Sequence, residues 1–454
     1  MLNIFNISTR KKIFALLFAM FLFITSFFVF LNIDERFYKT SIKIVESKEN
    51  TVALNPDVTI PDDYTTIQKG INHASPGDTI FVKSGIYKEN IIVDKKEIFI
   101  CGENKFTTII DGGKITDAVT ISAPCATLQG FTITNGWDEN DWHWNVSGVK
   151  ILSSNVVIED NIITLNRMGI NTAATAYNLT ISNNSFIDDG LLFGNFEYSH
   201  MTKESFFHTI TNNTINGKPL YYYKNHHNFS VPTDAGQIIL ADCTDVTIEH
   251  MYLTHTDFSI ILAFCSHCIV ENSTVTETDG EVVLIHSNNN MIQHNTISRS
   301  FHGICLDFES KYNVVRYNEV SYNLIGISVM TSSNNNLVHH NRIHNNQITT
   351  EGAGIWLLEQ AYNNTVSENE IYNNKVGIRV THGSVDNVIQ NNNFKKNFPI
   401  SAMFMVRSTN SWDNNYWNRP RILPKPIIGF KTVGKILIPW INIDWHPAKR
   451  PFEI

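Results

Sequence analysis

The sequence is poor in the residues that would indicate several familiar classes of protein. Its 454 residues include only 6 cysteines, and 35 lysines and arginines stand against 43 aspartates and glutamates. So few cysteines in a chain of this length exclude a disulfide scaffold. The body of the chain has no long basic run, which argues against a nucleic-acid partner bound through its phosphates. A hydrophobic share of 43% is too high for a disordered chain.

Long apolar runs are also scarce, and the one that is present lies near the amino terminus. Arg10, Lys11 and Lys12 precede the uncharged segment 13–31, which as a helix would span about 28 Å, enough to cross a bilayer core. The basic residues favour a cytoplasmic amino end and export of the remaining chain. A cleaved signal peptide is the alternative, but this run ends in bulky residues where a peptidase requires small ones.

We therefore expect a membrane anchor at residues 13–31, behind a cytoplasmic tail at 1–12 and ahead of a polar stalk at 32–57. The rest of the chain would lie on the extracellular or periplasmic face of that membrane.

No helical period fits the rest of the chain, whereas a repeat of about 23 residues does. Asparagines recur at this interval, and a Gly-Ile pair follows several of them eight residues later. The asparagines are Asn161, Asn184, Asn272, Asn295, Asn318, Asn341, Asn369 and Asn392, and the glycines are Gly169, Gly303, Gly326 and Gly377. Each repeat holds three short β-prone stretches separated by Asn- and Gly-rich corners.

This repeat predicts an all-β chain, a single-stranded right-handed parallel β-helix of about 23-residue coils, stacked about 4.8 Å apart. We assign it to residues 58–418, with the repeated asparagines as an amide ladder at one corner. Both ends of a solenoid must be covered. A cap helix within 65–74, with its first strand at TIFV, and a capping tail at 419–454 are expected to do this.

Several stretches resemble a known family. They are TIQKGINHASPGDTIFVKSGIYKENIIV, TINGKPLYYY, DAGQIILADCTDVTIEHMYLTHT, NYWN and INIDWHP. Over residues 60–450 the chain resembles the NosD-like right-handed β-helix proteins of the carbohydrate-binding and sugar-hydrolase (CASH) group, which are common on archaeal cell surfaces. The resemblance implies the fold. Members of this group include copper-accessory proteins, polysaccharide-modifying enzymes and proteins of no known activity, so the resemblance does not define one function. No motif carries the copper role to particular residues, so we predict no cofactor.

Three insertions enter the repeat at the same corner and are expected to form a wall of loops beside the strands that begin with Gly-Ile. The first carries Trp137, Trp142 and Trp144, which suit sugar stacking or packing on the coil. Its acids Asp138, Glu139 and Asp141 are oxygen ligands of the kind calcium prefers, although their spacing matches no defined calcium loop. The second insertion contains Tyr221, Tyr222, Tyr223, His226, His227 and Asp234, and the third precedes Gly354.

The strands beside this wall supply candidate catalytic residues. Alternation points Ile304, Leu306 and their counterparts inward, and Cys305, Asp307, Ser328, Met330, Trp356, Leu358, Arg379 and Thr381 outward. Glu309, Glu359, His382 and His286 follow as each strand turns. We expect Glu359 to stack on His382 and Trp356 to lie beside Arg379.

These residues predict sugar chemistry at this face. Asp307 and Glu309 would be about 6.5–7 Å apart on an extended strand, as paired carboxylates of a glycosidase are. A lyase would instead use a base together with a cation that stabilises the sugar carboxylate. The candidate catalytic residues are therefore Asp307, Glu309, Glu359 and His382, with Trp356 and Arg379 binding the sugar. A solvated strand face without chemistry is the alternative.

The cysteines allow two interpretations. Cys243 and Cys265 occupy equivalent places in adjacent coils, where a disulfide or a pair of buried thiols fits. Cys265, His267 and Cys268 form a weaker candidate for a soft metal such as Cu(I) or zinc.

Taken together, the sequence predicts a membrane-anchored surface protein that binds a polysaccharide or glycan. A lyase, hydrolase or epimerase acting on acidic sugars is the alternative, and a copper-accessory protein is the second alternative.

Overall fold

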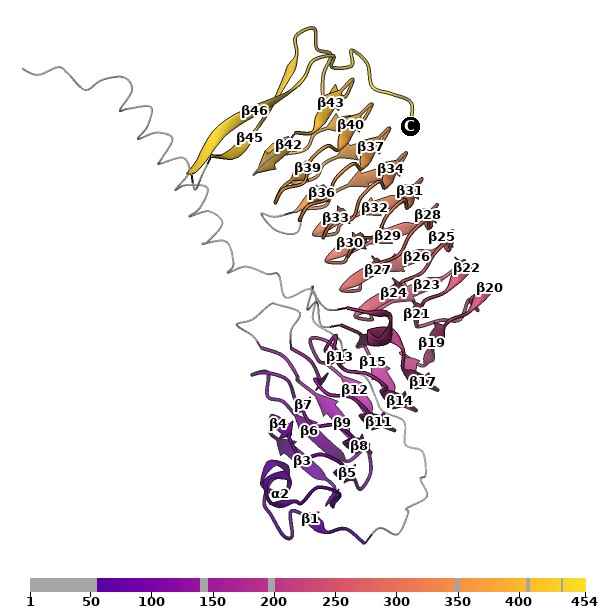
Figure 1. Ribbon diagram of the computed structural model, residues 1–454, viewed down its shortest axis with the longest axis vertical. Coiled ribbons are helices and arrows are strands. Elements are labelled where there is room, and N and C mark those ends of the chain that lie inside the picture. Colours follow the sequence, from indigo (N-terminus) through magenta and orange to yellow (C-terminus); the bar gives the residue numbers. More distant parts are fainter. Residues whose placement is uncertain (1–54, 139–145, 195–200, 348–351, 406–408, 434–435) are drawn as a thin grey trace, which may run out of the picture. The chain divides into compact units, whose positions relative to one another are not determined.

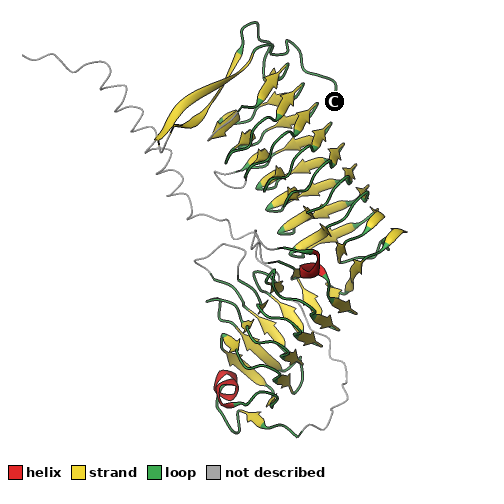
Figure 2. Cartoon of the chain, viewed as in Figure 1, coloured by secondary structure: helices red, strands yellow, loops and turns green. Residues whose placement is uncertain are grey.

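The computed structural model describes residues 55–138, 146–194, 201–347, 352–405, 409–433 and 436–454. Strands dominate this part of the chain, together with one α-helix and a short 3-10 helix (Figures 1 and 2). None of the helices in these ranges has the length and apolar character that crossing a bilayer requires. The predicted anchor at 13–31 lies outside the described residues.

The strands belong to two successive sections of parallel β-helix. In the amino-terminal section one sheet contains β1 (Val58–Ile60), β2 (Thr79–Val82), β5 (Phe99–Gly102), β8 (Thr127–Gln129), β11 (Val157–Glu159), β14 (Thr180–Ser182) and β17 (Thr209–Thr211). The second contains β3 (Gly85–Lys88), β6 (Thr108–Asp111), β9 (Thr132–Thr134), β12 (Ile162–Thr164), β15 (Ser185–Ile187) and β18 (Thr214–Ile215). The third contains β4 (Ile91–Val93), β7 (Val119–Ile121), β10 (Val149–Ile151), β13 (Ile170–Thr172) and β16 (Leu191–Leu192).

The carboxy-terminal section repeats this plan with three sheets, and the first of them is joined to the second sheet of the amino-terminal section through β18. The long sheet contains β19 (Lys218–Lys224), β21 (Gln237–Ala241), β24 (Phe258–Ala263), β27 (Gly280–Ile285), β30 (His302–Asp307), β33 (Ile325–Val329), β36 (Ala353–Leu357), β39 (Val376–Val380), β42 (Ile400–Met405), β45 (Lys425–Val433) and β46 (Ile436–Asp444). The middle sheet contains β20 (His227–Ser230), β22 (Thr244–Glu249), β25 (Ile269–Glu271), β28 (Met291–Gln293), β31 (Val314–Arg316), β34 (Leu337–His339), β37 (Thr365–Ser367), β40 (Val388–Gln390) and β43 (Ser411–Asp413). The third sheet contains β23 (Tyr252–Thr254), β26 (Thr274–Thr276), β29 (Thr296–Ser298), β32 (Glu319–Ser321), β35 (Arg342–His344), β38 (Glu370–Tyr372), β41 (Asn393–Lys395) and β44 (Tyr416–Trp417).

The junction between the two sections was not predicted. β18 and β19 pair antiparallel across a turn in which Gly217 has a φ of +78°. The second predicted loop does not project as a loop, because Tyr221, Tyr222 and Tyr223 lie in β19 and pair in parallel with β21. Its His227 begins β20, the first strand of the middle sheet.

Buried asparagines hold the coils in register, as predicted, but at three corners rather than one. At the corner between the middle and third sheets, the Oδ1 atom of Asn341 accepts from the backbone N–H of Asn318, and the Oδ1 atom of Asn369 accepts from that of Asn341, each at 3.0 Å. The side-chain amide of Asn341 also donates to the carbonyl oxygen of Val315 at 2.9 Å. Further ladders run through Asn313, Asn336 and Asn364, and through Asn323, Asn346 and Asn374.

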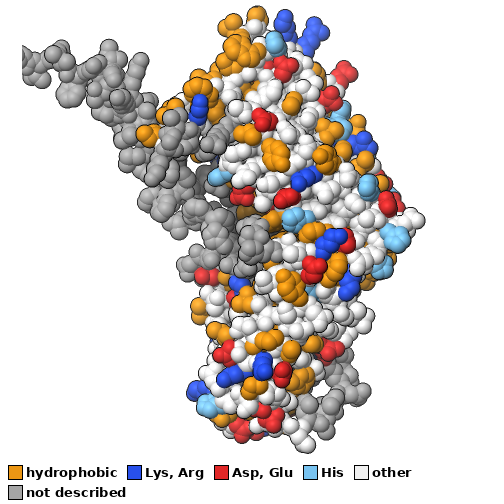
Figure 3. Space-filling model, in the orientation of Figure 1, with side chains coloured by type: hydrophobic (Ala, Val, Ile, Leu, Met, Phe, Trp, Pro, Cys, Tyr) orange, Lys and Arg blue, Asp and Glu red, His pale blue; other side chains and the backbone are white. Residues whose placement is uncertain are grey.

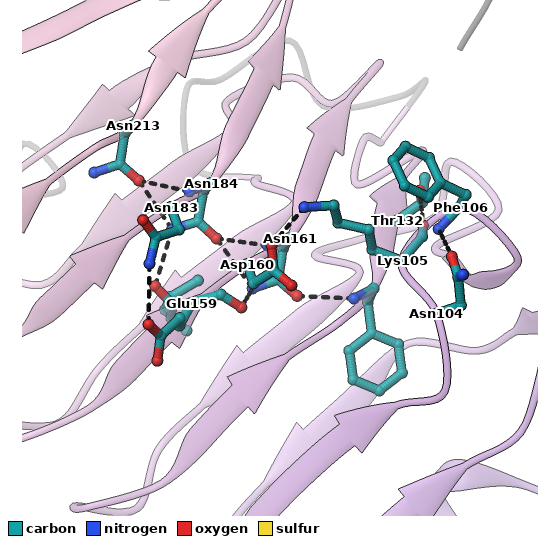
Figure 4. Close-up of polar contacts among 12 residues, drawn as sticks. Asn104, Lys105, Phe106, Thr132, Glu159, Asp160, Asn161, Asn183, Asn184 and Asn213 are labelled. Carbon is teal, nitrogen blue, oxygen red and sulfur yellow. Dashed lines mark hydrogen bonds and ion pairs between the residues drawn. The ribbon is translucent and has the colours of Figure 1, made fainter. Parts of the chain in front are cut away.

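The amino-terminal section has a ladder of the same kind. Asn161, Asn184 and Asn213 link three successive coils, and all three side chains are buried (Figure 4). The predicted member Asn272 is not part of any of these ladders. Ser273 takes the ladder position instead, and its backbone N–H donates to Oδ1 of Asn295. The coils here pair with a spacing of 22 residues, so the predicted alignment was wrong by one.

Both ends of the stack are covered. Helix α2 (Ile67–His73), capped by the Thr66 hydroxyl, buries Ile67 and Ile71, as the sequence predicts. The first strand is β1, however, and not the TIFV strand, because Val58 and Ile60 already alternate inward and pair with β2.

At the carboxy-terminal end, the antiparallel hairpin β45–β46 extends the long sheet. Its Asp444 ends the asparagine ladder by accepting from the backbone N–H of Asn415 at 3.0 Å and from Trp417 Nε1 at 2.8 Å. The hairpin also exposes hydrophobic side chains, including Ile428 and Ile441, which are 67% and 53% exposed. Hydrophobic side chains are visible on the surface at this end of the stack in Figure 3.

Candidate functional site

The outward face of the long sheet carries most of the predicted site residues. The register pairs Cys305 with Ser328, Ser328 with Trp356 and Trp356 with Arg379, so these side chains form one row. Inward neighbours such as Ile304 are fully buried, which confirms the predicted alternation. The outward row is not a solvated face, because Cys305 and Ser328 are buried and Trp356 and Arg379 are half-buried.

The corner that follows these strands has an unusual backbone. Glu309, Thr331, Glu359 and His382 all have positive φ, between +44° and +56°. Few residues other than glycine adopt this conformation, and for a β-branched residue such as Thr331 it is an outlier. The same conformation recurs at corners throughout the described coils, for example at Leu165, Tyr322 and Lys396, so it belongs to the turns of the coil and does not by itself mark a site.

Asp307 is the buried carboxyl group of this corner, with 3% of its surface exposed. Burial raises the pKa of Asp307 from 3.8 to about 7, and the nearby Glu359 carboxylate also raises it. Hydrogen bonds from the Thr331 hydroxyl and from the backbone N–H of Phe308, 2.8 Å from Oδ1, act in the opposite direction. Since burial is the larger cause, both protonation states of Asp307 are populated near pH 7.

Thr331 connects two carboxyl groups. Its hydroxyl lies 3.2 Å from Oε2 of Glu359 and also interacts with Asp307. A hydroxyl has one proton to donate. It can therefore donate to Glu359 and accept from Asp307 at the same time only when Asp307 is protonated. The Thr331 hydroxyl thus donates to the exposed Glu359 carboxylate and lies near enough to the buried Asp307 to lower the pKa of Asp307.

Trp356 and Arg379 lie side by side in adjacent strands, as predicted. The guanidinium carbon of Arg379 is 4.8 Å from the centroid of the Trp356 ring, a cation–π distance. The indole Nε1–H donates to Oγ1 of Thr381 at 2.8 Å. An aromatic ring fixed by a hydrogen bond thus holds a cation on the same face as the carboxyl groups.

His302 was missed from the sequence. Its Nδ1 atom lies 2.9 Å from the Ser328 hydroxyl, and burial lowers the pKa of His302 to about 4. The ring is therefore neutral at pH 7. The thiol of Cys305 lies nearby in the same row, and burial raises its pKa, so it remains protonated and is no nucleophile. Strict alternation along β30 places His302 on the inward side together with Ile304, so alternation does not select it as a site residue.

The predicted pairing of Asp307 with Glu309 is wrong. β30 ends at Asp307, and Phe308 and Glu309 both turn with positive φ, so the two carboxyl groups are not on an extended strand. Glu309 is exposed and binds Lys311 Nζ at 3.0 Å, which lowers the pKa of Glu309. The carboxyl group that approaches Asp307 is Glu359, from the second coil after it.

His382 lies at the same corner in the coil after Glu359, as predicted. The backbone N–H of Gln360 donates to the His382 carbonyl oxygen at 3.0 Å, which joins the two turns. The His382 side chain is exposed, as is that of Glu359.

The tryptophan loop is described only in part. Trp137 and Asp138 are half-buried, whereas Trp142, Trp144, Glu139 and Asp141 lie outside the described residues. Sugar stacking and calcium binding at this loop stay predictions.

The structure decides between the two alternatives for Cys243 and Cys265. They are buried free thiols, as one alternative predicted, and not a disulfide. The Sγ atom of Cys265 donates to the carbonyl oxygen of Leu240 at 3.4 Å, so the coil backbone satisfies it. The predicted metal site of Cys265, His267 and Cys268 does not assemble, because both thiols are buried while His267, at φ +57°, is exposed.

Comparison with known proteins agrees with this fold. Residues 236–394 match the family model described as a right handed beta helix region. The described part of the chain is therefore a parallel β-helix whose matched stretch is of the right-handed kind. No curated protein matches the sequence significantly.

Solved structures that resemble the chain are distant. A DFA-IIIase from Arthrobacter chlorophenolicus A6, solved in complex with DFA-III, is 10% identical with a TM-score of 0.33, over 79% of this chain and 75% of that one. The mannuronan C-5 epimerase AlgE4 A-module of Azotobacter vinelandii is 14% identical with a TM-score of 0.29, over 80% and 89%. The Dettilon tailspike protein is 13% identical with a TM-score of 0.30, over 72% of this chain, which spans 62% of the tailspike chain. These scores are too low to bear on the activity of this chain.

Proposed function

We propose that the corner around Asp307, Thr331 and Glu359 binds an acidic polysaccharide and catalyses proton transfer on it, as a lyase, hydrolase or epimerase would. The observation that carries the proposal is the raised pKa of Asp307, about 7, beside the Thr331 hydroxyl, which donates to a second, exposed carboxyl group on Glu359. A catalytic acid or base works best when its pKa lies near the working pH. Pairs of carboxyl groups in different environments mark such acid and base roles.

The two carboxyl groups would divide the work. Glu359 is exposed, so a sugar can reach it, and it would take a proton from the substrate or from a water molecule. The protonated Glu359 would donate to the Thr331 hydroxyl, which would pass its own proton to ionised Asp307. The buried carboxyl group would hold that proton until the reverse transfer returns it. In this arrangement Asp307 stores a proton and Glu359 exchanges it.

Arg379 and Trp356 would bind the sugar. A guanidinium group pairs with a carboxylate in two-pronged geometry, so Arg379 suits the carboxylate of an acidic sugar. Neutralising that carboxylate would also stabilise the negative charge that develops when the neighbouring carbon loses its proton. Trp356 offers an apolar ring face or edge for the sugar ring.

A glycan-binding protein without catalysis is the second candidate. The Trp356–Arg379 pair favours it, because stacking and charge pairing suffice for binding and need no proton transfer. In this case Trp137, Trp142 and Trp144 would also bind sugar, as the sequence predicts.

The location of the protein is a proposal that rests on the sequence. We propose attachment to a membrane through residues 13–31 and exposure of the β-helix on the extracellular or periplasmic face. The resemblance to NosD-like and archaeal surface proteins rests on the sequence in the same way, and no cofactor is proposed from it.

The test is incubation of the purified full-length protein with a panel of uronate-containing and neutral polysaccharides. Three readouts separate the reactions: ultraviolet absorbance of unsaturated uronates for a lyase, new reducing ends for a hydrolase, and deuterium exchange at C5 for an epimerase. Asp307→Asn and Glu359→Gln should each reduce the rate by at least about 100-fold, the typical contribution of acid–base catalysis.

Glu309→Gln is the matched control, because Glu309 lies at the same corner but is neutralised by Lys311. Binding without any product would replace the enzyme by the glycan-binding protein. Full activity in Asp307→Asn would contradict the assignment of the site.

A further inference from the structure

A second corner of the coil, between the middle and third sheets, brings together histidines of the carboxy-terminal section. Tyr317, His340 and Glu368 occupy equivalent places in three successive coils, each with a φ between +53° and +56°. The backbone N–H of Tyr317 donates to the His340 carbonyl oxygen at 3.1 Å, and that of His340 donates to the Glu368 carbonyl oxygen at 3.0 Å. The side chains at this corner are therefore stacked along the axis by the backbone.

The turn also brings two consecutive histidines to the same side. Neighbouring residues of a strand point to opposite faces of a sheet. β34 ends at His339, however, and the left-handed turn at His340 directs both rings to the same place. Their Nδ1 atoms lie 2.8 Å apart.

Glu368 completes a cluster with these rings. Its Oε2 atom lies 3.1 Å from Nε2 of His340. One ligand atom from each of His339, His340 and Glu368 lies within 4.8 Å of the other two, and all three side chains are half-buried. Tyr317 borders the cluster, with its ring centroid 5.1 Å from that of His340.

We propose that His339, His340 and Glu368 bind a divalent transition-metal ion, for which Zn²⁺ is the probe. Two imidazoles and a carboxylate are a ligand set that zinc uses in proteins, with a fourth position open to water or another ligand. Imidazole nitrogen excludes calcium and magnesium as preferred ions, since these select oxygen ligands. A site built on stacked strands is also held more firmly than one on a loop.

His340 lies in the middle of the cluster and would contribute one of its two nitrogens. The other nitrogen remains for a hydrogen bond. Glu368 either ligates the ion directly or accepts that N–H, as carboxylates do behind zinc-bound histidines. In both cases the loss of the Glu368 charge weakens binding.

The site is separate from the proposed catalytic corner. Glu359 lies in the turn that follows β36 of the long sheet, whereas Glu368 follows β37 of the middle sheet, at the next corner of the same coil. Metal binding here does not depend on the proposed enzymatic reaction, so either proposal can fail alone.

Isothermal titration of the full-length protein with Zn²⁺ tests the proposal. We expect one site per chain, which His340→Gln abolishes and Glu368→Gln weakens by about 10-fold or more. Substitution with Co²⁺ should give visible absorption bands typical of four-coordinate nitrogen and oxygen ligation, lost in the same variants. Circular dichroism of each variant separates lost binding from lost folding.

His250→Gln is the control, because His250 lies at the same corner beside Glu249, 3.6 Å away, with no second histidine contact among the described residues. It should bind Zn²⁺ as the unchanged protein does. The proposal is overturned if no stoichiometric binding is found. It is equally overturned if His340→Gln binds like His250→Gln, which would leave the cluster as a hydrogen-bonded triad.

Discussion

Replacing Asp307 with asparagine should stabilise the protein in mildly alkaline solution and leave its stability unchanged in acid. The side chain is 3% exposed, and burial raises the pKa of Asp307 from 3.8 to about 7. Asparagine has the same shape, retains an acceptor for the Phe308 N–H, and offers an N–H toward Thr331 where protonated Asp307 offers an O–H.

The magnitude follows from proton linkage. Between pH 3.8 and about 7 the unfolded chain has lost the proton that folded Asp307 retains. The free energy of unfolding therefore falls by about 1.4 kcal/mol for each pH unit in this window. Over the whole window this amounts to about 4 kcal/mol, which the wild type loses and the asparagine variant does not. Above pH 7 the difference stays constant, and below pH 3.8 it vanishes.

Thermal unfolding followed by circular dichroism at pH 4, 6 and 8 measures this difference. With an unfolding entropy of about 2.1 cal/mol/K per residue over about 400 residues, 4 kcal/mol corresponds to a Tm increase of about 5 °C at pH 8. The increase should be smaller at pH 6 and close to zero at pH 4.

An Asp307→Asn variant whose Tm differs from the wild type by the same amount at every pH would refute the reasoning, since only a titrating group gives a pH-dependent difference. Glu309→Gln provides a control of opposite sign. Its pKa is lowered by Lys311, so removing its charge should destabilise the protein slightly at pH 7, by no more than about 1 kcal/mol for an exposed pair.

Two other stability predictions follow from the ladders and the corner. Asn341→Ala should lower the free energy of unfolding by at least about 3 kcal/mol in urea titrations, because several buried partners lose a hydrogen bond, each at about 1–3 kcal/mol. Asn272→Ala should cost only about 1 kcal/mol, since Asn272 is outside the ladder and only its positive φ is unfavourable for alanine; equal losses would contradict the ladder assignment. Glu359→Ala and His382→Ala should leave the Tm within about 1 °C of the wild type, because both side chains are exposed, and a large decrease in either would disprove their place outside the core.

The fold could be predicted because its signal is local and repeated. Most coils of the carboxy-terminal section contribute the same asparagine and the same short alternating strands, so the spacing of Asn295, Asn318 and Asn341 is enough to indicate the ladder. The error at Asn272 came from assuming a constant period, since the coil that contains Ser273 is one residue shorter.

The site could be predicted only in part, because its decisive contacts join different coils. Alternation identified Asp307, Trp356 and Arg379 as outward residues, and the register confirmed the last two as neighbours. The partner of Asp307 was misidentified, since sequence proximity favoured Glu309. The positive φ of Phe308 turns the chain between Asp307 and Glu309. Phenylalanine rarely adopts this conformation, so nothing in the local sequence indicates the turn.

The junction between the two sections could not be predicted either. Tyr221 and its neighbours form a polar aromatic stretch that suits a loop as well as a strand. Only the long-range pairing of Tyr221 with Ile238 makes it a strand.

Asp444 gives the asparagine ladder a direction and an end. The Asn318 side chain accepts from the backbone N–H of Asn295 and donates to the carbonyl oxygen of Ile292, both in the preceding coil. The backbone N–H of Asn318 then donates to the asparagine of the next coil, so the ladder continues wherever another asparagine follows. A carboxylate accepts in the same way but has no N–H to donate. Asp444 therefore behaves as a chain terminator in a one-dimensional polymer of coils. We therefore expect that whole coils can be inserted or removed ahead of Asp444 without redesigning the end of the β-helix.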